Sequence, residues 1–177
     1  GSSWRKDGVG RSRRKPVQGL ESLQVLTPEE AIKQSPNLSG PIVVYDDEQG
    51  YLAGVIADHL SFDEHEVIFI TPASVVSPWT ESTLEQKRIQ KALLVSGVNV
   101  ICNKTIDKAE GSSLNLKCVF TGEISLLKCS SLVMVTERIP NTTLYDQLVE
   151  QENNTEQGVA KHIQLIGDAE SPGLIAD

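Results

Sequence analysis

After its first forty residues, the chain alternates between short apolar runs and stretches whose apolar residues recur at helical spacing. The apolar runs lie at 42–45, 66–70 and 98–102, and such runs are typical of strands buried on both faces of a parallel sheet. Between the runs, the spacing predicts a helix over about 51–60 and a longer helix over about 78–96. Strands that alternate with helices in this way indicate a doubly wound, Rossmann-like α/β domain.

Two of the helices have recognisable starts. Thr27 can cap a short helix, because Pro28 suits the first helical position and Glu30 completes a capping box. Thr80 can cap the longer helix, whose apolar face is expected to include Leu84. Both helices are therefore expected to begin where a polar side chain satisfies their first backbone N–H groups.

The pattern changes beyond the third strand. Apolar and polar residues alternate over 114–118 and 124–126, and an apolar run follows at 132–135. Together they predict a small antiparallel meander attached to the parallel sheet. A short helix is expected over 142–150 and a strand over 162–166. The predicted fold class is thus a three-layer α/β domain of parallel sheet, helices and meander.

Charge is distributed unevenly along the 177 residues, whose net charge is −8. Residues 1–15 hold six basic residues and one acidic residue, whereas the remainder holds ten basic and 23 acidic residues. An acidic body argues against nucleic acid as the main partner. The basic stretch at 11–15 is either a phosphate-binding arm or a solvated connector between domains, and we favour the connector.

Composition bounds the class of protein. A hydrophobic content of 39% is enough for a core. No apolar run approaches the roughly 20 residues of a membrane-spanning helix, and the chain does not open on a signal-peptide pattern. We therefore expect a cytoplasmic protein that makes no membrane contact.

Side chains capable of covalent or metal chemistry are few. The three cysteines, Cys102, Cys118 and Cys129, form no C-x-x-C pair, so they indicate neither a disulfide framework nor a metal site. They lie in or beside apolar runs and are expected to be buried free thiols. No Gly-x-Ser-x-Gly nucleophile elbow occurs, and the three histidines are interpreted as surface or packing residues. No catalytic residue is expected in this chain.

The turn after the first strand combines carboxylates with glycines. A dinucleotide site places Gly-x-Gly-x-x-Gly here, so that the diphosphate can approach the helix N-terminus. This chain has Asp46, Asp47 and Glu48, followed by Gly50 and Gly54 as the remains of such a loop. The carboxylates could hold a divalent metal ion, but we favour a solvated loop that caps the next helix.

The C-terminal segment ends a short apolar run in Gly167, Asp168 and Ala169. Gly167 permits a tight turn at the end of a strand. Asp168 then places a carboxylate at the carboxyl edge of a sheet, which is where open α/β sheets bind ligands.

Four segments, at 1–8, 26–29, 133–141 and 163–177, are similar in amino-acid sequence to a known family. They resemble the C-terminal region of the trimethylamine dehydrogenase family of NADH:flavin oxidoreductases, whose relatives include the 2,4-dienoyl-CoA reductases. The resemblance implies an NAD(P)-binding-like Rossmann domain over 25–153. That domain would be inserted in a partial FAD-type domain made of residues 1–24 and 154–177.

The resemblance also implies a larger parent enzyme. Such a parent, expected to be a homo-oligomer, oxidises an amine or reduces an enoyl thioester in a barrel that holds FMN and an iron–sulfur cluster. Its FAD-like domain holds FAD or ADP, with Gly167, Asp168 and Ala169 on that side. The partners of this chain would be the barrel and the rest of the FAD-like domain. No cofactor is expected in the fragment alone.

Three departures from the family pattern argue against NAD(P)H binding. Carboxylates occupy the diphosphate turn, and their repulsion of a phosphate charge about 4 Å away would be on the order of 4 kcal/mol near a protein surface. The second strand ends at Thr71 instead of an acidic residue that binds ribose, and Glu137 replaces a glycine. We therefore expect a non-catalytic region of a flavin-dependent oxidoreductase. The alternatives are a competent NAD(P)H-binding module that passes hydride to flavin and a non-redox interaction domain.

Overall fold

The computed structural model describes residues 1–154 and 163–173. The chain divides into two compact units. We name Trp4–Glu137 the central unit, and Gly1–Ser3 with Arg138–Asp177 the terminal unit.

The central unit is built on a five-stranded sheet in which every strand pairs in parallel with its neighbours. In spatial order its strands are β2 (Gln24–Leu26), β9 (Ser131–Val135), β3 (Ile42–Asp46), β4 (Val67–Ile70) and β5 (Asn99–Ile101). The three apolar runs predicted as strands correspond to β3, β4 and β5. The pattern does not predict β2, whose three residues are too few to show a period.

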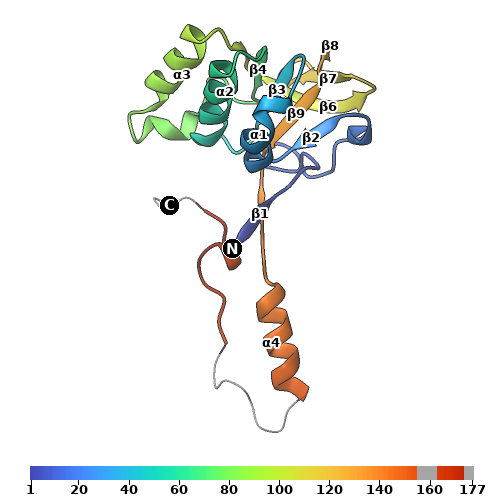
Figure 1. Ribbon diagram of the computed structural model, residues 1–177, viewed down its shortest axis with the longest axis vertical. Helices are drawn as coiled ribbons and strands as arrows, with labels where there is room; N and C mark the ends of the chain where they lie inside the picture. Colours follow the sequence, from blue (N-terminus) through green and yellow to red (C-terminus); the bar gives the residue numbers. More distant parts are fainter. Residues whose placement is uncertain (155–162, 174–177) are drawn as a thin grey trace. The chain divides into compact units, whose positions relative to one another are not determined.

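This sheet is the middle of three layers, with helices on one face and the meander on the other, as the sequence predicts (Figure 1). Residues of β3 alternate between two cores: Ile42 and Val44 pack with the helices, whereas Val43 and Tyr45 pack with the meander. All five residues of β3 are buried, which explains why this strand appears in the sequence as a continuous apolar run.

Helices α1 (Pro28–Gln34), α2 (Leu52–Phe62) and α3 (Gln86–Val95) form one outer layer. The capping box predicted for α1 is present. The Glu30 backbone N–H donates to Thr27 Oγ1 at 3.2 Å, and the Thr27 N–H donates to Glu30 Oε2 at 2.9 Å.

The expected start of the longer helix is wrong. The Thr80 hydroxyl does not cap α3 but donates to the Ser77 carbonyl oxygen at 2.7 Å. Leu84 has a left-handed φ of 62° and is 90% exposed, so it interrupts the helix and lies outside its apolar face. The short 3-10 helices are η1 (Leu20–Ser22), η2 (Ser35–Asn37) and η3 (Pro78–Glu81).

An antiparallel three-stranded sheet covers the other face of the parallel sheet. Its strands are β6 (Lys104–Glu110), β7 (Ser113–Cys118) and β8 (Ile124–Lys128). The meander is confirmed, but its composition differs from the prediction. The run at 132–135 belongs to β9 of the parallel sheet, and β6, which the pattern does not show, supplies the third strand.

The terminal unit contains α4 (Thr143–Asn154) and η4 (Gly167–Ala169), and β10 (Arg138–Pro140) pairs with β1 (Ser2–Trp4). The helix predicted over 142–150 is therefore confirmed. The predicted strand over 162–166 is wrong for residues 163–166, which have no strand partner among the described residues. Residue 162 lies outside the described residues. So do residues 174–177, which belong to the segment 163–177 that carries the family resemblance.

Candidate functional site: the acidic turn and the Gly-Asp turn

The acidic turn, residues 46–50, leads from the carboxyl end of β3 to α2. Asp46 and Asp47 are both completely buried. Neither caps the helix, since the N-cap of α2 is Tyr51 without a side-chain hydrogen bond, and the first turn holds no acidic residue. The expectation of a solvated, helix-capping loop is therefore wrong for these two carboxylates. The reason is tertiary contact, which closes the turn from water.

Asp46 is held in an environment that favours its neutral form. Its Oδ1 accepts a hydrogen bond from the Gln49 backbone N–H at 2.7 Å, while its Oδ2 is buried without a hydrogen-bond partner. Burial raises the pKa of Asp46 to about 8, against the opposing effect of the Gln49 N–H, and the charges of Glu48 and Asp47 raise it further. At neutral pH, Asp46 therefore retains its proton in most molecules.

Asp47 accepts its hydrogen bonds from the N-terminal basic segment. The Ser12 backbone N–H lies 2.9 Å from Asp47 Oδ2 and 3.2 Å from Oδ1. Burial raises the pKa of Asp47, and the bond from Ser12 opposes this effect. A Cβ atom on Gly10 would lie 2.5 Å from Asp47 Oδ2, so only glycine allows this approach. The sequence analysis did not predict this contact. The uneven charge distribution, with a basic N-terminal segment and an acidic remainder, could have indicated it.

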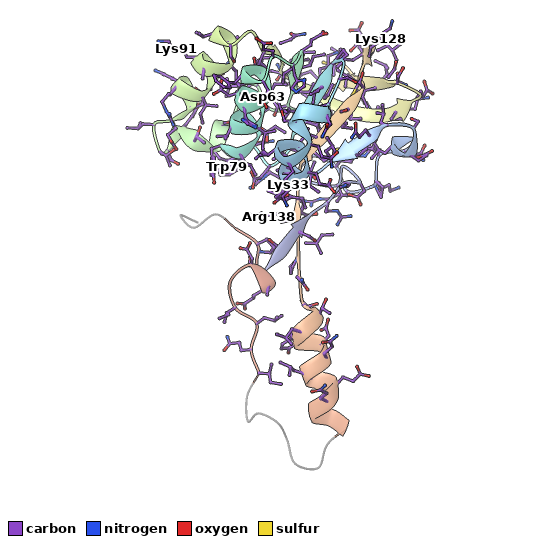
Figure 2. All side chains as sticks on the ribbon, viewed as in Figure 1. Lys33, Asp63, Trp79, Lys91, Lys128 and Arg138 are labelled. Atoms are coloured by element: carbon purple, nitrogen blue, oxygen red, sulfur yellow. The ribbon has the colours of Figure 1, made fainter. Side chains whose placement is uncertain are left out.

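Arginines of the same segment anchor it over the turn. Arg11 Nε donates to the Glu48 carbonyl oxygen at 3.0 Å, and its guanidinium carbon lies 4.9 Å from the ring centroid of Trp79 on η3. Figure 2 labels Trp79. Arg13 donates to the Ile106 carbonyl oxygen of β6 at 2.9 Å. The basic stretch is thus held against other parts of the central unit, although the Arg11 side chain stays exposed. We call residues 8–14 the basic arm.

The two glycines assigned to the remains of a dinucleotide loop have other surroundings. Gly54 lies inside α2, and a Cβ there would come within 2.5 Å of Ile89 Cγ2 on α3, so this glycine lets the two helices pack closely. Gly50 is buried but does not have a positive φ. The left-handed residue of the turn is Gln49, with φ 69°.

The other two residues that differ from the family pattern, Thr71 and Glu137, also interact with groups of the protein itself. Thr71 is completely buried, and its hydroxyl oxygen accepts the Ala73 backbone N–H at 3.2 Å. The Glu137 carboxylate lies 3.6 Å from the Arg5 guanidinium. Both side chains thus have a partner within the protein.

A serine, a histidine and an aspartate meet away from the acidic turn, which the sequence does not reveal. The Ser35 hydroxyl donates to Asp63 Oδ2, and His65 Nε2 lies 2.9 Å from the Ser35 carbonyl oxygen. A carbonyl oxygen only accepts, so this nitrogen carries the proton and cannot act as a base toward the hydroxyl. Ser35 is also completely buried. The cluster joins η2 to the turn after α2 and has no features of a nucleophilic site.

The cysteines differ more than expected. Cys129 is buried, but Cys102 and Cys118 are partly exposed, so the expectation of three buried thiols is wrong for two of them. Hydrogen bonds from Thr121, first its side chain and then its backbone N–H, lower the pKa of Cys118 to about 7. In the part of the chain that the structure describes, no group of three His, Cys, Asp or Glu side chains could hold a metal ion.

The Gly-Asp turn lies in the terminal unit and forms η4. Gly167 adopts a left-handed φ of 57°, as expected of a turn that needs glycine. Asp168 Oδ2 accepts the Ser2 hydroxyl at 2.8 Å and lies 3.6 Å from the guanidinium of Arg138, which Figure 2 labels. The bond from Ser2 is the main cause that lowers the pKa of Asp168. This carboxylate is therefore ionised, and 39% of its side chain is exposed.

The sequence and the structure of this chain are similar to those of several known proteins. No protein-family model matches the chain. Dimethylamine dehydrogenase from Hyphomicrobium sp. (strain x) is 24% identical over 197 residues, which span all of this chain and 27% of that protein. Histamine dehydrogenase from Rhizobium sp. 4-9 has a TM-score of 0.93 and 34% identity over 99% of this chain and 28% of its own.

The chain is a homologue of dimethylamine dehydrogenase over its full length, and its structure matches that of histamine dehydrogenase. A third relative, 6-hydroxypseudooxynicotine amine oxidase (HisD) from Pseudomonas geniculata N1, has a TM-score of 0.90 and 31% identity over 99% of this chain and 26% of its own. The homology confirms the resemblance recognised in the sequence. The chain spans little more than a quarter of the length of these relatives, 26% to 28%.

More distant structures share the fold alone. Thioredoxin reductase from T. acidophilum has a TM-score of 0.61 with 15% identity, over 81% of this chain and 44% of its own. The fold is therefore that of Rossmann-like reductases. Within the described ranges, no helix is both long and apolar enough to cross a lipid bilayer.

Proposed function

We propose that this chain is a dinucleotide-binding-like module of a longer, flavin-dependent oxidoreductase that acts on amines. We further propose that the module is non-catalytic and does not bind NAD(P)H. Homology to amine dehydrogenases supports the first part. The second part depends on one observation: the basic arm occupies the turn between β3 and α2, where a diphosphate would bind.

The electrostatics of the turn support this proposal. A diphosphate at this position would have to displace the Ser12 N–H from Asp47 and would leave that buried carboxylate without a donor. An unsatisfied buried acceptor costs about 1–3 kcal/mol, more if it is charged. A phosphate about 4 Å from an ionised Asp47 would add repulsion on the order of 4 kcal/mol at a surface-like dielectric constant. Together these costs correspond to a loss of affinity of roughly a thousandfold or more.

The chain must also change conformation to admit the nucleotide. The arm is anchored at three points, by Arg11 to the Glu48 carbonyl oxygen, by Arg11 to the Trp79 ring and by Arg13 to the Ile106 carbonyl oxygen. Binding would require the loss of these contacts before any new contact forms. We infer that the Rossmann-like fold serves here as a scaffold.

The same proposal places the cofactors of the parent enzyme away from the acidic turn. FMN and an iron–sulfur cluster would be held in a barrel outside this chain, because thiolate clusters need several cysteines close together. FAD or ADP would lie on the side of the Gly-Asp turn. The ionised, partly exposed carboxylate of Asp168 fits a ribose or ribityl hydroxyl, since such a carboxylate only accepts hydrogen bonds. Gly167 and Ala169 would supply backbone groups beside it. FAD, when bound, would supply electron transfer, whereas ADP would supply none.

Isothermal titration of the chain with NADH and with NADPH tests the proposal. We expect no measurable heat of binding, which corresponds to a Kd of about 1 mM or weaker. Micromolar binding of either nucleotide would instead establish a competent NAD(P)H module. A titration of Asp47→Asn beside the wild type shows whether the carboxylate charge contributes, because the amide oxygen of this variant can still accept the Ser12 N–H.

A further inference from the structure

Strand β8 of the meander carries apolar side chains on the face that points to water. Leu127 lies opposite Leu114 of β7 and packs with it in the core, so the alternate residues Ile124 and Leu126 point outward. Ile124 is 48% exposed and Leu126 is 66% exposed. An antiparallel sheet with one face in water normally has apolar residues inside and polar residues outside. β8 reverses this order, because Ser125 takes a position on the inner side.

The turn that joins β7 to β8 adds two more exposed apolar side chains. Val119 is 42% exposed and Phe120 is 79% exposed. The turn is held by backbone hydrogen bonds, since the Val119 N–H donates to the Asn103 carbonyl oxygen and the Gly122 N–H to the Cys118 carbonyl oxygen, both at 3.0 Å. Single exposed apolar residues are common, whereas a group of them marks an interaction site. We call the four apolar residues of 119–126, which are Val119, Phe120, Ile124 and Leu126, the apolar patch.

Two lysines flank the apolar patch. Lys117 lies directly opposite Ile124 on the neighbouring strand, and Lys128 follows Leu126 by two residues, so both lie on the outward face. Both are exposed, and Figure 2 labels Lys128. Strands β7 and β8 contain no acidic residue. Glu123, in the turn before β8, belongs by alternation to the inner side. The outer face of β7 and β8 is therefore apolar and basic, in a chain whose net charge is −8.

The type of cation selects among the partners that could cover this face. Lysine is depleted in protein–protein interfaces, where arginine is enriched. At the surface of a lipid bilayer, lysine keeps its ammonium group in water and lays its methylene stem along apolar groups. Exposed apolar side chains enter the headgroup layer, and anionic headgroups attract the cations. The acidic remainder of the chain opposes this attraction weakly, because the Debye length is about 8 Å at physiological ionic strength.

We propose that the outer face of β7 and β8 docks on the surface of an anionic lipid bilayer. The apolar patch enters the headgroup layer, and Lys117 and Lys128 contact anionic headgroups. This inference goes beyond the proposed function and does not depend on it. The sequence analysis expects no membrane contact because no apolar run is long enough to span a bilayer. That length is a requirement for spanning, and contact with the surface does not need it.

Sedimentation with lipid vesicles tests this inference. The 177-residue chain and the full-length natural polypeptide that contains it are each mixed with vesicles of phosphatidylcholine containing about 30% phosphatidylserine, and with vesicles of phosphatidylcholine alone. Two lysines at about fivefold each predict roughly 20-fold tighter binding to the anionic vesicles, and this difference should disappear at an ionic strength of roughly 1 M. Equal binding to the two kinds of vesicle, or no binding, would overturn the inference. Binding by the 177-residue chain alone would also overturn it, because the face would then be covered in the longer polypeptide.

Matched substitutions separate this face from the rest of the surface. Leu126→Asp is expected to weaken binding to the anionic vesicles by about tenfold or more, because it removes an apolar contact and adds a negative charge. Leu94→Asp makes the same change on α3, at a leucine that is 59% exposed, and should weaken binding by less than about twofold. Equal losses in the two variants would overturn the inference.

Lysine variants test the electrostatic part. Lys128→Gln is expected to weaken binding to the anionic vesicles by about fivefold. Lys91→Gln, at an exposed lysine on α3 that Figure 2 also labels, is the control and should leave binding unchanged. Sedimentation velocity without lipid covers the other occupant. A dimer of the chain that Leu126→Asp dissociates, without vesicle binding by the wild type, would overturn the inference in favour of contact between two copies.

Discussion

The carboxylate of Asp47 accepts the backbone N–H of Ser12 at 2.9 Å, across 35 residues of sequence. This bond joins the most basic segment of the chain to its acidic turn. Because Asp47 is completely buried, the bond replaces the solvation that the carboxylate loses on folding. It therefore orders a segment that would otherwise be a loop in water.

Removal of this acceptor should release the basic arm. Asp47→Ala is expected to lower the free energy of unfolding by about 1–3 kcal/mol, because the Ser12 N–H loses its partner and a cavity forms. Urea unfolding measures the stability, and hydrogen exchange of residues 10–14 measures the release. Asp58→Ala, at an exposed position on α2, should change stability by less than about 0.5 kcal/mol. Unchanged exchange of residues 10–14 in Asp47→Ala would show that the bond does not hold the arm.

Asp46 should make the protein less stable as the pH rises. Its pKa is 3.8 in the reference state and about 8 in the fold, so between these values the unfolded chain binds fewer protons than the folded one. Stability contributed by the bound proton is complete below pH 4 and is lost progressively up to pH 8. The slope from one group reaches about 1.4 kcal/mol per pH unit at most.

Asp46→Asn should remove this component. The amide keeps an oxygen for the Gln49 N–H and places its NH₂ where the unpartnered Oδ2 lies. Urea unfolding at several pH values between 5 and 8 gives the slope for both proteins. Parallel curves for wild type and variant would mean that Asp46 is ionised in the fold throughout this range.

Gly54 should be required for the packing of α2 on α3. A Cβ at this position lies 2.5 Å from Ile89 Cγ2, so Gly54→Ala is expected to cost about 1–3 kcal/mol through overpacking. Ile89→Ala removes the obstructing atom. In that background Gly54→Ala should stabilise the protein by up to about 1 kcal/mol, because alanine favours a helix over glycine. The same sign in both backgrounds, in a thermal or urea unfolding experiment, would contradict this explanation.

Cys118 should be the most reactive thiol at neutral pH. Its pKa is lowered to about 7 by hydrogen bonds from Thr121, whereas burial raises the pKa of Cys102 and raises that of Cys129 to about 11. Alkylation by iodoacetamide, followed by peptide mass spectrometry, should label Cys118 first, with a rate that rises through a midpoint near its pKa. Thr121→Val should move that midpoint upward. An unshifted midpoint would show that the Thr121 hydroxyl does not stabilise the thiolate.

The sequence predicts those parts of the fold whose causes are local. The apolar runs of β3 and β4 and the capping box at Thr27 each depend on a few neighbouring residues, and all of them form as expected. The start of α3 was not predictable in this way. Helical spacing places Leu84 on the apolar face, but its left-handed backbone lies outside any periodic pattern.

The candidate site depends on contacts that are distant in sequence. Asp47 accepts its hydrogen bonds from the basic arm, and Gly54 fits closely against Ile89 on another helix. The spacing of residues within 46–54 indicates neither the basic arm nor Ile89 as a partner. The strand expected at 162–166 is wrong over residues 163–166 for a related reason, since a strand needs a partner and no described segment pairs with these residues.

The attachment of the basic arm to the same chain has a kinetic and thermodynamic consequence for nucleotides. If the proposed function holds, the arm is a tethered competitor, and its covalent attachment 35 residues away gives it an effective concentration in the roughly millimolar range at the acidic turn. A dissolved nucleotide present at micromolar levels would have to outcompete this internal ligand at every encounter. Variants that shorten or detach the arm would thus change apparent affinity even where they alter no atom of the turn.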